Sequence, residues 1–427
     1  MKSFGIRRET KSIWERRTPI IPSDAKEIIE KYEYKLYVQP SEIRIFKDEE
    51  YKNIGAILDE KLDTEFIFGI KEIPPDFFEF GKKYVFFSHT IKGQKHNMPM
   101  LKRMLELKTT LIDYEKITDE KGRRLIAFGR FAGIAGMIDT LWAFGRRLEY
   151  EGLKTPFLKV RRAYEYYNLQ KIKDEFKKIK EEIKEGLSKE ISPLTIGILG
   201  YGNVSSGVQE ILNLLDVKYI KPDEVPAIKG NDNEIYASIF KEEDLVERKD
   251  GKNFNLEEYY HSPELYKSRF ETFIPYLSMI VNCIYWDQRY PRFITKDYFR
   301  DLYSKGKPKI KVIGDISCDI NGSVEFTQFA EEPDKPCYVY EPLTGNFKFG
   351  FEGEGVVVVA VDILPSELPR DASIYFSGIL KSFLPKIIEA KYPEDFKNCT
   401  LPEFLKNGVI VYRGELTEKY KYIEKYL

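Results

Sequence analysis

The sequence predicts an α/β protein made of two domains, each with a mostly parallel sheet. At 427 residues the chain is longer than one hydrophobic core normally supports. In its first third, short apolar runs alternate with charged stretches of helical character, a pattern typical of parallel strands joined by crossover helices. A second strand–turn–helix unit opens at Leu194, well beyond the first series.

The first series contains three expected strands, residues 65–70, 84–87 and 109–112, with a helix expected at 95–107. Residues 133–148 predict a buried helix whose glycines permit close packing. Residues 163–187, dense in Lys and Glu with aliphatics at helical spacing, predict a solvated amphipathic helix.

The second series begins with the strand Thr195–Leu199, and its further buried strands are expected at 278–285, 309–315 and 356–361. Between them, residues 222–272 are rich in charge and Tyr and are interpreted as long irregular stretches. From about residue 365 the chain returns to helix, loop and a short strand.

Composition favours a small ligand. Lys and Arg total 68 against 69 Asp and Glu, so charge gives no reason to expect nucleic acid or an anionic membrane as partner. The four cysteines are far apart, which argues against a disulfide framework or a metal site. The N-terminus lacks a signal-peptide pattern and no apolar run could span a bilayer, so we expect a cytoplasmic protein.

A glycine turn at 200–202 is the clearest binding motif. The apolar strand runs directly into Gly200 and Gly202, and a helix starting with Asn203 and Val204 follows. Such a turn lets the backbone and the helix N-terminus approach a pyrophosphate, although Ser205 replaces the third glycine and a tight turn without ligand is the alternative. Lys218, about 20 residues on, favours a 2′-phosphate and thus NADP(H), with NAD(H) as the alternative because Asp223 lies close.

Several polar residues follow expected strands directly. Lys71 comes after residues 65–70 and His89 after 84–87, which places two titratable groups at strand ends as a candidate acid–base pair. Arg17 beside a proline offers a planar fork for a carboxylate. Asp315 and Asp319 follow the strand 309–315. Ordinary surface positions are the alternative for each of these residues.

The same residues carry a resemblance. The chain resembles the alanine dehydrogenase, transhydrogenase and lysine-forming saccharopine dehydrogenase superfamily, and within it the lysine–2-oxoglutarate reductase half of aminoadipic semialdehyde synthase. The similar stretches run in order through nearly the whole chain: 7–22, 69–75, 86–94, 111–138, 192–207, 284–295, 314–326, 361–373 and 416–423.

The resemblance implies two Rossmann-like domains with an interdomain cleft. The substrate domain would comprise residues 1–140 and 365–427, and the dinucleotide-binding domain residues 141–364. Lys71 and His89 would be the acid–base pair. Further positions that the resemblance assigns to substrate binding are Lys11, Arg17, Glu72, Lys92 and Glu115. Asp319 is preferred over Asp315 as the functional aspartate at the nicotinamide.

The implied reaction is the reductive condensation of L-lysine with 2-oxoglutarate to saccharopine, with NADPH as reductant. Three alternatives remain open: alanine dehydrogenase chemistry, coupling of a different amino acid to give another opine-like product, and a non-catalytic nucleotide-binding regulator. Retention of both Lys71 and His89 argues against the regulator, since binding alone needs neither. The oligomeric state and the physiological direction stay open.

Overall fold

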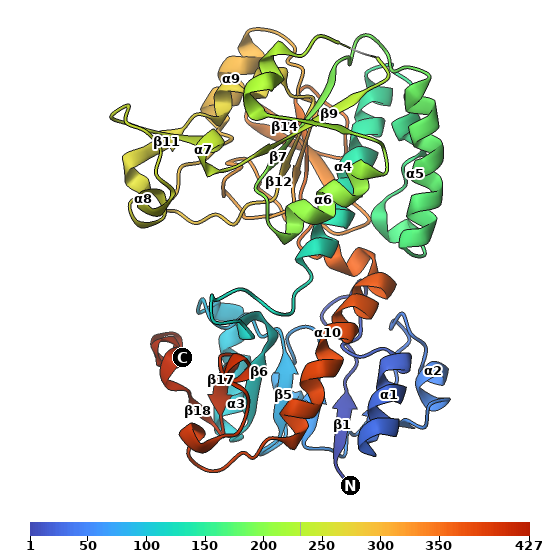
Figure 1. The fold of residues 1–427 in the computed structure, drawn as a ribbon, viewed down its shortest axis with the longest axis vertical. Helices are drawn as coiled ribbons and strands as arrows, with labels where there is room; N and C mark the ends of the chain where they lie inside the picture. The colour runs from blue at the N-terminus through green and yellow to red at the C-terminus, as the bar shows by residue number, and fades with distance from the viewer. Residues whose placement is uncertain (231) are drawn as a thin grey trace. The chain divides into compact units, whose positions relative to one another are not determined.

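The computed structural model describes residues 1–230 and 232–427 and divides into two compact units (Figure 1). The first unit combines residues 1–128 with 369–427, and the second comprises residues 129–368. Each unit has an eight-stranded, mostly parallel sheet, so the predicted α/β class is confirmed. The boundaries differ from the expected ones, because residues 129–140 and 365–368 lie with the second unit.

The sheet of the first unit has the strand order β18-β17-β6-β5-β4-β1-β2-β3. Its strands are β1 (Ser3–Ile6), β2 (Lys35–Val38), β3 (Ile57–Leu58), β4 (Phe66–Phe68), β5 (Lys83–Phe86), β6 (Thr110–Asp113), β17 (Val409–Tyr412) and β18 (Glu415–Leu416). All neighbouring pairs are parallel except those that β17 makes with β6 and β18. The expected strands at 65–70, 84–87 and 109–112 are confirmed as β4, β5 and β6.

Helices from both chain ends pack together in this unit. They are α1 (Pro22–Tyr32), α2 (Asp48–Lys52), α3 (Met98–Glu106), α10 (Pro369–Glu389) and α11 (Glu403–Lys406). Ser377 of α10 donates a hydrogen bond to Asp24 of α1 at 2.5 Å. Together with β17, α10 therefore ties the C-terminal segment to the N-terminal one, as the orange-red helix over the strands in Figure 1 shows.

The sheet of the second unit has the order β15-β14-β16-β13-β12-β7-β9-β8. Its strands are β7 (Leu194–Leu199), β8 (Lys218–Ile220), β9 (Ile235–Phe240), β12 (Met279–Asn282), β13 (Val312–Asp315), β14 (Cys337–Glu341), β15 (Asn346–Phe349) and β16 (Val356–Val359), and β10 (Val246–Arg248) pairs apart with β11 (Tyr266–Ser268). The helices are α4 (Gly129–Tyr150), α5 (Leu169–Lys184), α6 (Asn203–Asn213), α7 (Glu242–Leu245), α8 (Leu256–His261) and α9 (Lys296–Ser304).

Strands β8, β9, β14 and β15 of this sheet were not predicted, and β9 matters most for the site. The stretch 222–272 is not irregular throughout, because Ile235–Phe240 forms β9, which pairs with β7 along its whole length. Its sequence IYASIF is a short apolar and β-branched run between charged residues, the same signal that identified the other strands. The amphipathic helix expected at 163–187 is also shorter: α5 begins at Leu169, and its buried face comprises Ile172, Phe176, Ile179 and Ile183.

Two glycines explain why α4 belongs to the second unit. A Cβ on Gly133 would lie 1.9 Å from the carbonyl oxygen of Val204, and a Cβ on Gly207 would lie 2.0 Å from that of Arg130. The backbones of α4 and α6 therefore touch directly, which no larger residue would allow. The expectation that the glycines of α4 permit close packing is confirmed.

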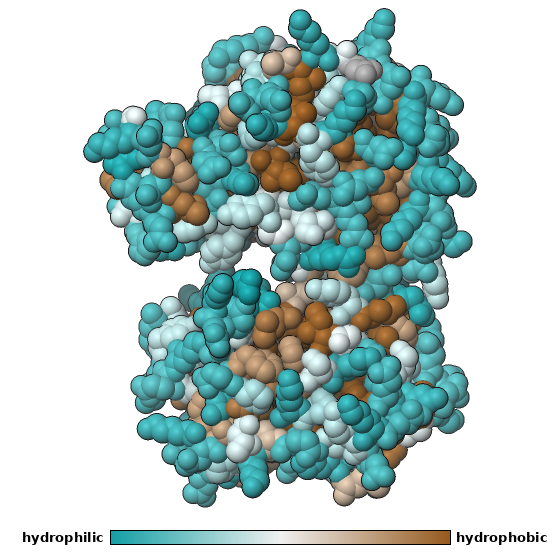
Figure 2. Space-filling model, viewed as in Figure 1, coloured by the Kyte–Doolittle hydropathy of each residue, from teal (hydrophilic) through white to brown (hydrophobic). Residues whose placement is uncertain are grey.

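The visible face in Figure 2 is mostly hydrophilic, in keeping with the 32% of charged residues in the sequence. Within the described part of the chain, no helix combines the length and the apolar character needed to cross a bilayer.

Candidate functional site

The carboxyl edge of the first sheet gathers most of the expected substrate-binding residues. Strands β4, β5 and β6 are parallel and in register, with Phe68 opposite Val85 and Phe86 opposite Asp113. The chain that follows each strand therefore emerges at the same edge. These three segments carry Lys71 and Glu72, His89, and Glu115 respectively.

Glu72 is the centre of a small ionic cluster. Its Oε1 lies 2.6 Å from His89 Nδ1, and both carboxylate oxygens accept hydrogen bonds of 2.9 Å from Lys11 Nζ. Burial alone would raise the pKa of Glu72, but the hydrogen bonds and charges of His89 and Lys11 outweigh it and hold that pKa below its ordinary value. Glu72 is therefore an anion that orients the imidazole.

His89 adopts an unusual backbone conformation with a φ of 47°, which is rare outside glycine. Its neighbours hold it there. The Ser88 N–H and hydroxyl donate to the buried Asp113 carboxylate at 3.0 and 2.5 Å, and Asn97 Nδ2 donates to the His89 carbonyl at 3.1 Å. The ring also stacks on Phe87. These contacts direct the imidazole towards Glu72.

Lys71 differs from a surface lysine in its electrostatic environment. Burial is the largest influence that lowers the pKa of its amine, followed by the positive charge of Arg17, while Glu72 opposes the shift. The backbone beside it is anchored as well, because the Glu9 carboxylate accepts the N–H groups of Ile70 and Lys71 at 2.7 and 3.0 Å. The backbone at Lys71 is thus fixed, and the side-chain amine loses its proton more readily than that of an exposed lysine.

Arg17 is buried rather than exposed. Its side chain is 2% exposed and makes a bidentate pair with Glu15, with Nε and Nη2 at 2.7 and 2.5 Å from the two carboxylate oxygens. The guanidinium also lies over the Phe128 ring, 4.2 Å from its centroid. Glu15 and Phe128 therefore fix the orientation of this planar fork.

Glu115 and Lys92, which were also expected to bind substrate, contact residues other than Glu72. Glu115 pairs with Arg124 Nη2 at 2.5 Å, and its backbone N–H donates to Asp113. Lys92 is exposed, three residues beyond His89, with its backbone N–H donating to Gln94 Oε1 at 3.2 Å.

In the second unit, the glycine turn has the geometry that a pyrophosphate requires. Gly200 has a φ of +92°, and a Cβ there would lie 2.7 Å from Ile284. Gly202 has open space around it, and the exposed Asn203 opens α6, so the helix N-terminus and its N–H groups are accessible. Ser205 is buried within α6 and accepts a hydrogen bond from Gln209. The serine at the third position of the motif is therefore accommodated inside the helix.

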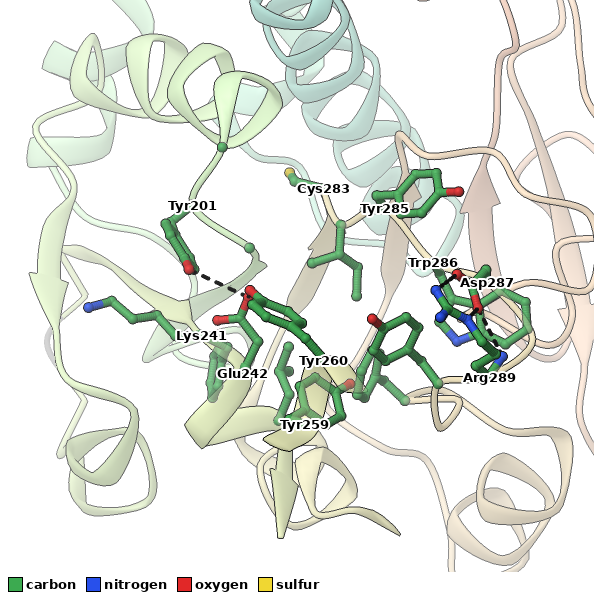
Figure 3. A pocket seen from close by; sticks show the side chains of 17 residues that line it. Tyr201, Lys241, Glu242, Tyr259, Tyr260, Cys283, Tyr285, Trp286, Asp287 and Arg289 are labelled. Atoms are coloured by element: carbon green, nitrogen blue, oxygen red, sulfur yellow. Dashed lines mark hydrogen bonds and ion pairs between the residues drawn. The ribbon is translucent and has the colours of Figure 1, made fainter. Parts of the chain in front are cut away.

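A cavity of about 490 Å³ adjoins this turn (Figure 3). Its lining residues are Gly200, Tyr201, Gly202, Phe240, Lys241, Glu242, Leu245, Tyr259, Tyr260, Cys283, Ile284, Tyr285, Trp286, Asp287, Arg289, Tyr290 and Phe293. Most of them follow the carboxyl ends of β7, β9 and β12, whose registers align Leu199 with Phe240 and Asn282, and Tyr259 and Tyr260 come from α8. Size, aromatic lining and the adjacent turn fit an adenosine group.

Asp315 and Asp319 have different environments. Asp315 is fully buried and accepts hydrogen bonds from Asn282, Ser317 and Thr327 at 2.7, 2.8 and 2.5 Å, and its burial raises the pKa of its carboxyl. It thereby joins the ends of β12 and β13 to the loop that follows. Asp319 is half-buried in that loop, and its preference over Asp315 as the functional aspartate stays a prediction.

Known proteins resemble the chain at three levels. Residues 5–135 match the family model of the alanine dehydrogenase/PNT N-terminal domain. Over 99% of its length the chain is 38% identical to an alpha-aminoadipic semialdehyde synthase of Arabidopsis thaliana and 35% identical to the mitochondrial one of Mus musculus, and covers 41% and 47% of them. Nearly the whole chain is thus similar to part of these synthases.

The chain spans less than half of the length of those synthases. It is also 28% identical, over 90% of its length and 91% of the relative's, to a saccharopine dehydrogenase [NAD(+), L-lysine-forming] of Yarrowia lipolytica. Among solved structures, an L-alanine dehydrogenase (TM-score 0.64, 16% identity) covers 99% of the chain, and 98% of that structure is covered. A transhydrogenase of Sinorhizobium meliloti (TM-score 0.54, 13% identity) covers 97% of the chain and is 98% covered. These structures show the fold, two Rossmann-like domains.

One residue expected to bind the cofactor lies away from the glycine turn. Lys218 is the first residue of β8, at the amino end of the parallel pair that β8 makes with β9, and it is paired with Glu234. It therefore lies at the edge opposite to Gly200. The error arose because the missed strand β9, not β8, neighbours β7.

The buried pair of Arg7 and Glu9 was also missed as a contributor to the site. Arg7 Nη1 lies 3.3 Å from Glu9 Oε2, and Glu9 in turn holds the backbone at Lys71. Arg7 and Glu9 directly follow β1, the same signal that identified Lys71 and His89. Within the described residues, no group of three or more His, Cys, Asp and Glu side chains could hold a metal ion.

Proposed function

We propose that this protein catalyses the reductive condensation of L-lysine with 2-oxoglutarate to saccharopine, using a reduced nicotinamide dinucleotide. The observation that carries the proposal is the cluster of Lys71, Glu72, His89 and Lys11 at one sheet edge, in a chain similar over its whole length to the aminoadipic semialdehyde synthases. An oxidoreductase of amino acids needs such proton-transfer groups, whereas a nucleotide-binding regulator does not.

The first unit would be the substrate domain and the second the dinucleotide-binding domain. Gly200, Gly202, Asn203 and Val204 would hold the pyrophosphate, since the turn offers a close backbone approach and an accessible helix N-terminus. When bound, the nicotinamide would supply a hydride to the imine carbon. Asp319, in the loop that follows β13, would lie beside the nicotinamide.

The residues of the first unit would manage the protons. The ε-amine of lysine must be neutral to attack the ketone carbon, and Lys71, with its lowered pKa, would take that proton. Nitrogen adds to the carbonyl carbon to give a carbinolamine, which must lose water to form the imine. His89, oriented by Glu72, would deliver the proton to the departing hydroxyl. Arg17 would contact a carboxylate of the oxo acid, with Lys11, Lys92 and Glu115 around the substrate.

A residue other than the expected Lys218 must decide between NADH and NADPH. The preference for NADPH rested on Lys218, which lies at the other sheet edge. The residues that follow β9, beside Gly200, are the ones placed to discriminate. Cytoplasmic localisation remains a prediction; the mouse relative is named as mitochondrial.

A panel of substrates tests the proposal. NADH and NADPH oxidation would be measured with 2-oxoglutarate and a series of amino acids, and with pyruvate and ammonia as the alanine dehydrogenase control. We expect oxidation with L-lysine and 2-oxoglutarate and identification of saccharopine by mass spectrometry. Turnover of pyruvate and ammonia alone, or nucleotide binding without any turnover, would contradict it.

A further inference from the structure

The end of β9 is the part of the nucleotide cavity where a ribose is recognised in sheets of this kind. The Gly200 N–H donates to the Phe240 carbonyl at 2.9 Å, so the residues after Phe240 lie directly beside the glycine turn. In dinucleotide-binding folds, a side chain in this region contacts the adenosine ribose and distinguishes a 2′-hydroxyl from a 2′-phosphate. Two charged residues of opposite sign stand there, Lys241 and Glu242.

Glu242 is held inside the cavity. Its Oε1 accepts a hydrogen bond of 2.7 Å from the Tyr260 hydroxyl, and the Tyr201 hydroxyl lies 3.5 Å from the same oxygen (Figure 3). Both hydroxyls approach Oε1, so Oε2 is the carboxylate oxygen directed to a ligand; within the described residues nothing donates to it. Tyr201 lies between the two glycines of the turn, which links the carboxylate to the pyrophosphate-binding backbone.

The state of Tyr260 supports this arrangement. Burial, and next its hydrogen bond to Glu242, raises the pKa of Tyr260 above its ordinary value, so the phenol remains a donor at neutral pH. The Tyr260 hydroxyl donates its hydrogen bond to Glu242 Oε1 and thereby orients the carboxylate plane. Tyr260 therefore acts as a positioning residue for Glu242.

Lys241 is placed differently. Its side chain is exposed, and Nζ lies 5.9 Å from the centroid of the Tyr201 ring. Figure 3 shows it extending away from Glu242 and Tyr260. Lys241 also lines the cavity, but its ammonium lies near the Tyr201 ring, whereas Glu242 is held by Tyr260 and Tyr201.

We propose that Glu242 reads the adenosine ribose and makes this site select NAD(H) over NADP(H). The proposal rests on the proposed function, because it takes the glycine turn to be the nicotinamide dinucleotide site. A carboxylate accepts hydrogen bonds from the two ribose hydroxyls. A 2′-phosphate offers no such donor at that position and brings about −1.5 to −2 charges next to a carboxylate, which repels it.

Direct binding measurements on the full chain, without substrate, test the proposal. Calorimetry with NADH, NADPH, ADP-ribose and 2′-phospho-ADP-ribose would give four dissociation constants for each variant. We expect NADH to bind at least about tenfold more tightly than NADPH, and Glu242→Gln to weaken NADH binding about tenfold or more, as the loss of charge-assisted hydrogen bonds predicts. NADPH binding should stay equal or improve. Glu242→Ser should likewise weaken NADH binding without weakening NADPH binding.

Two further variants sharpen the assignment. Glu243→Gln is the matched control, because Glu243 is the next residue, is exposed and does not line the cavity; it should leave all four constants unchanged. Tyr260→Phe should lower the NADH-to-NADPH preference without weakening NADPH binding, a result that a merely structural role would not produce.

The outcomes separate this proposal from the proposed function. Tighter binding of NADPH by the natural protein, loss of NADPH binding in Lys241→Ala with no effect of Glu242→Gln, or equal weakening of both nucleotides by Glu242→Gln would overturn the role of Glu242 alone. Failure of all four nucleotides to bind would overturn the proposed function together with it.

Discussion

At the scale of single residues, Lys71 and His89 are influenced by different neighbours. Burial and the nearby Arg17 lower the pKa of Lys71, whereas His89 is oriented by a hydrogen bond from Nδ1 to Glu72. That bond occupies one ring nitrogen and leaves Nε2 for exchange with a substrate. The two groups are therefore suited to separate steps, base and acid.

Removing either group should affect turnover rather than nucleotide binding. Lys71→Met keeps the length of the side chain without the amine, and His89→Gln keeps a hydrogen bond to Glu72 without a titratable ring. Each should lower kcat on the order of 10²–10⁴-fold, the usual contribution of a positioned acid or base. Steady-state kinetics with calorimetry of NADH binding would measure this, and unchanged kcat in both variants would remove them from the chemistry.

Because it is buried against Glu15, Arg17 should also contribute to the stability of the protein. Arg17→Ala should weaken oxo-acid binding, but it also leaves the 3%-exposed Glu15 without its partner. Breaking a buried pair costs roughly 3–5 kcal/mol of unfolding free energy. Urea denaturation should show that loss, and the double variant Glu15→Gln, Arg17→Met should recover part of it. A stable Arg17→Ala with weak substrate binding would mean that the pair contributes little to stability.

At the scale of elements, the contact between α4 and α6 depends on two absent side chains. A Cβ on Gly133 or Gly207 would overlap a backbone carbonyl of the facing helix. The contact sets the start of α6, where the pyrophosphate would bind, so packing and binding are coupled in this pair.

Gly207→Ala should therefore destabilise the protein by several kcal/mol, because overpacking at a backbone contact forces the helices apart. Gly378→Ala is the control, since its site in α10 has nothing within 4 Å; it should stabilise by about 0.5–1 kcal/mol through helix propensity. Chemical denaturation measures both. Equal effects of the two substitutions would contradict the close contact.

Two buried carboxyl groups join α4 to the 3₁₀ turn Leu364–Glu367. Asp139 and Glu367 are 0% and 1% exposed, and their carboxyl groups lie within hydrogen-bonding reach of each other. Asp139 also accepts the Ala163 N–H at 2.8 Å, and the Tyr164 backbone interacts with Glu367. Burial raises the pKa of Asp139 to about 7, and burial together with the Asp139 charge raises the pKa of Glu367 well above its ordinary value. Arg162 and Glu165 face Asp139 with opposite charges.

This pair should make stability depend on pH. Because the folded-state pKa values lie above the unfolded ones, the stabilisation is fully present below pH about 4 and is lost as pH rises through about 7 and beyond. Urea unfolding at pH 5, 7 and 9 should show that loss in the natural protein and a smaller one in Glu367→Gln. The same pH dependence of the unfolding free energy in both proteins would contradict a contribution from Asp139 and Glu367.

At the scale of the whole molecule, the two units bring together chain segments in different ways. The first unit is built from both chain ends, through α10 and the antiparallel pairing of β17 with β6, whereas the second is one continuous segment. A ligand of one unit should therefore stabilise that unit specifically.

NADH should protect residues 129–368 from hydrogen exchange more than residues 1–128 and 369–427. At a concentration of 100 times Kd, binding to the native state adds about 2.7 kcal/mol against global unfolding of the bound unit. Hydrogen exchange resolved by mass spectrometry measures the two units in one sample. Equal protection of the two units, or protection of the first unit alone, would place the nucleotide elsewhere.

The sequence by itself determined the α/β class, the strands β4, β5, β6, β7, β12, β13 and β16, the glycine turn, and the placement of Lys71 and His89 at strand ends. These features depend on local periodicity and on the rule that parallel strands end at one edge, so residues close in sequence decide them. Only the tertiary structure decided that β9 neighbours β7, so that the residues after β9, and not Lys218, lie beside the glycine turn. It also decided that Arg17 is buried on Glu15 and that Asp139 meets Glu367. Strand order and burial arise from contacts between distant segments, and local pattern does not encode those contacts.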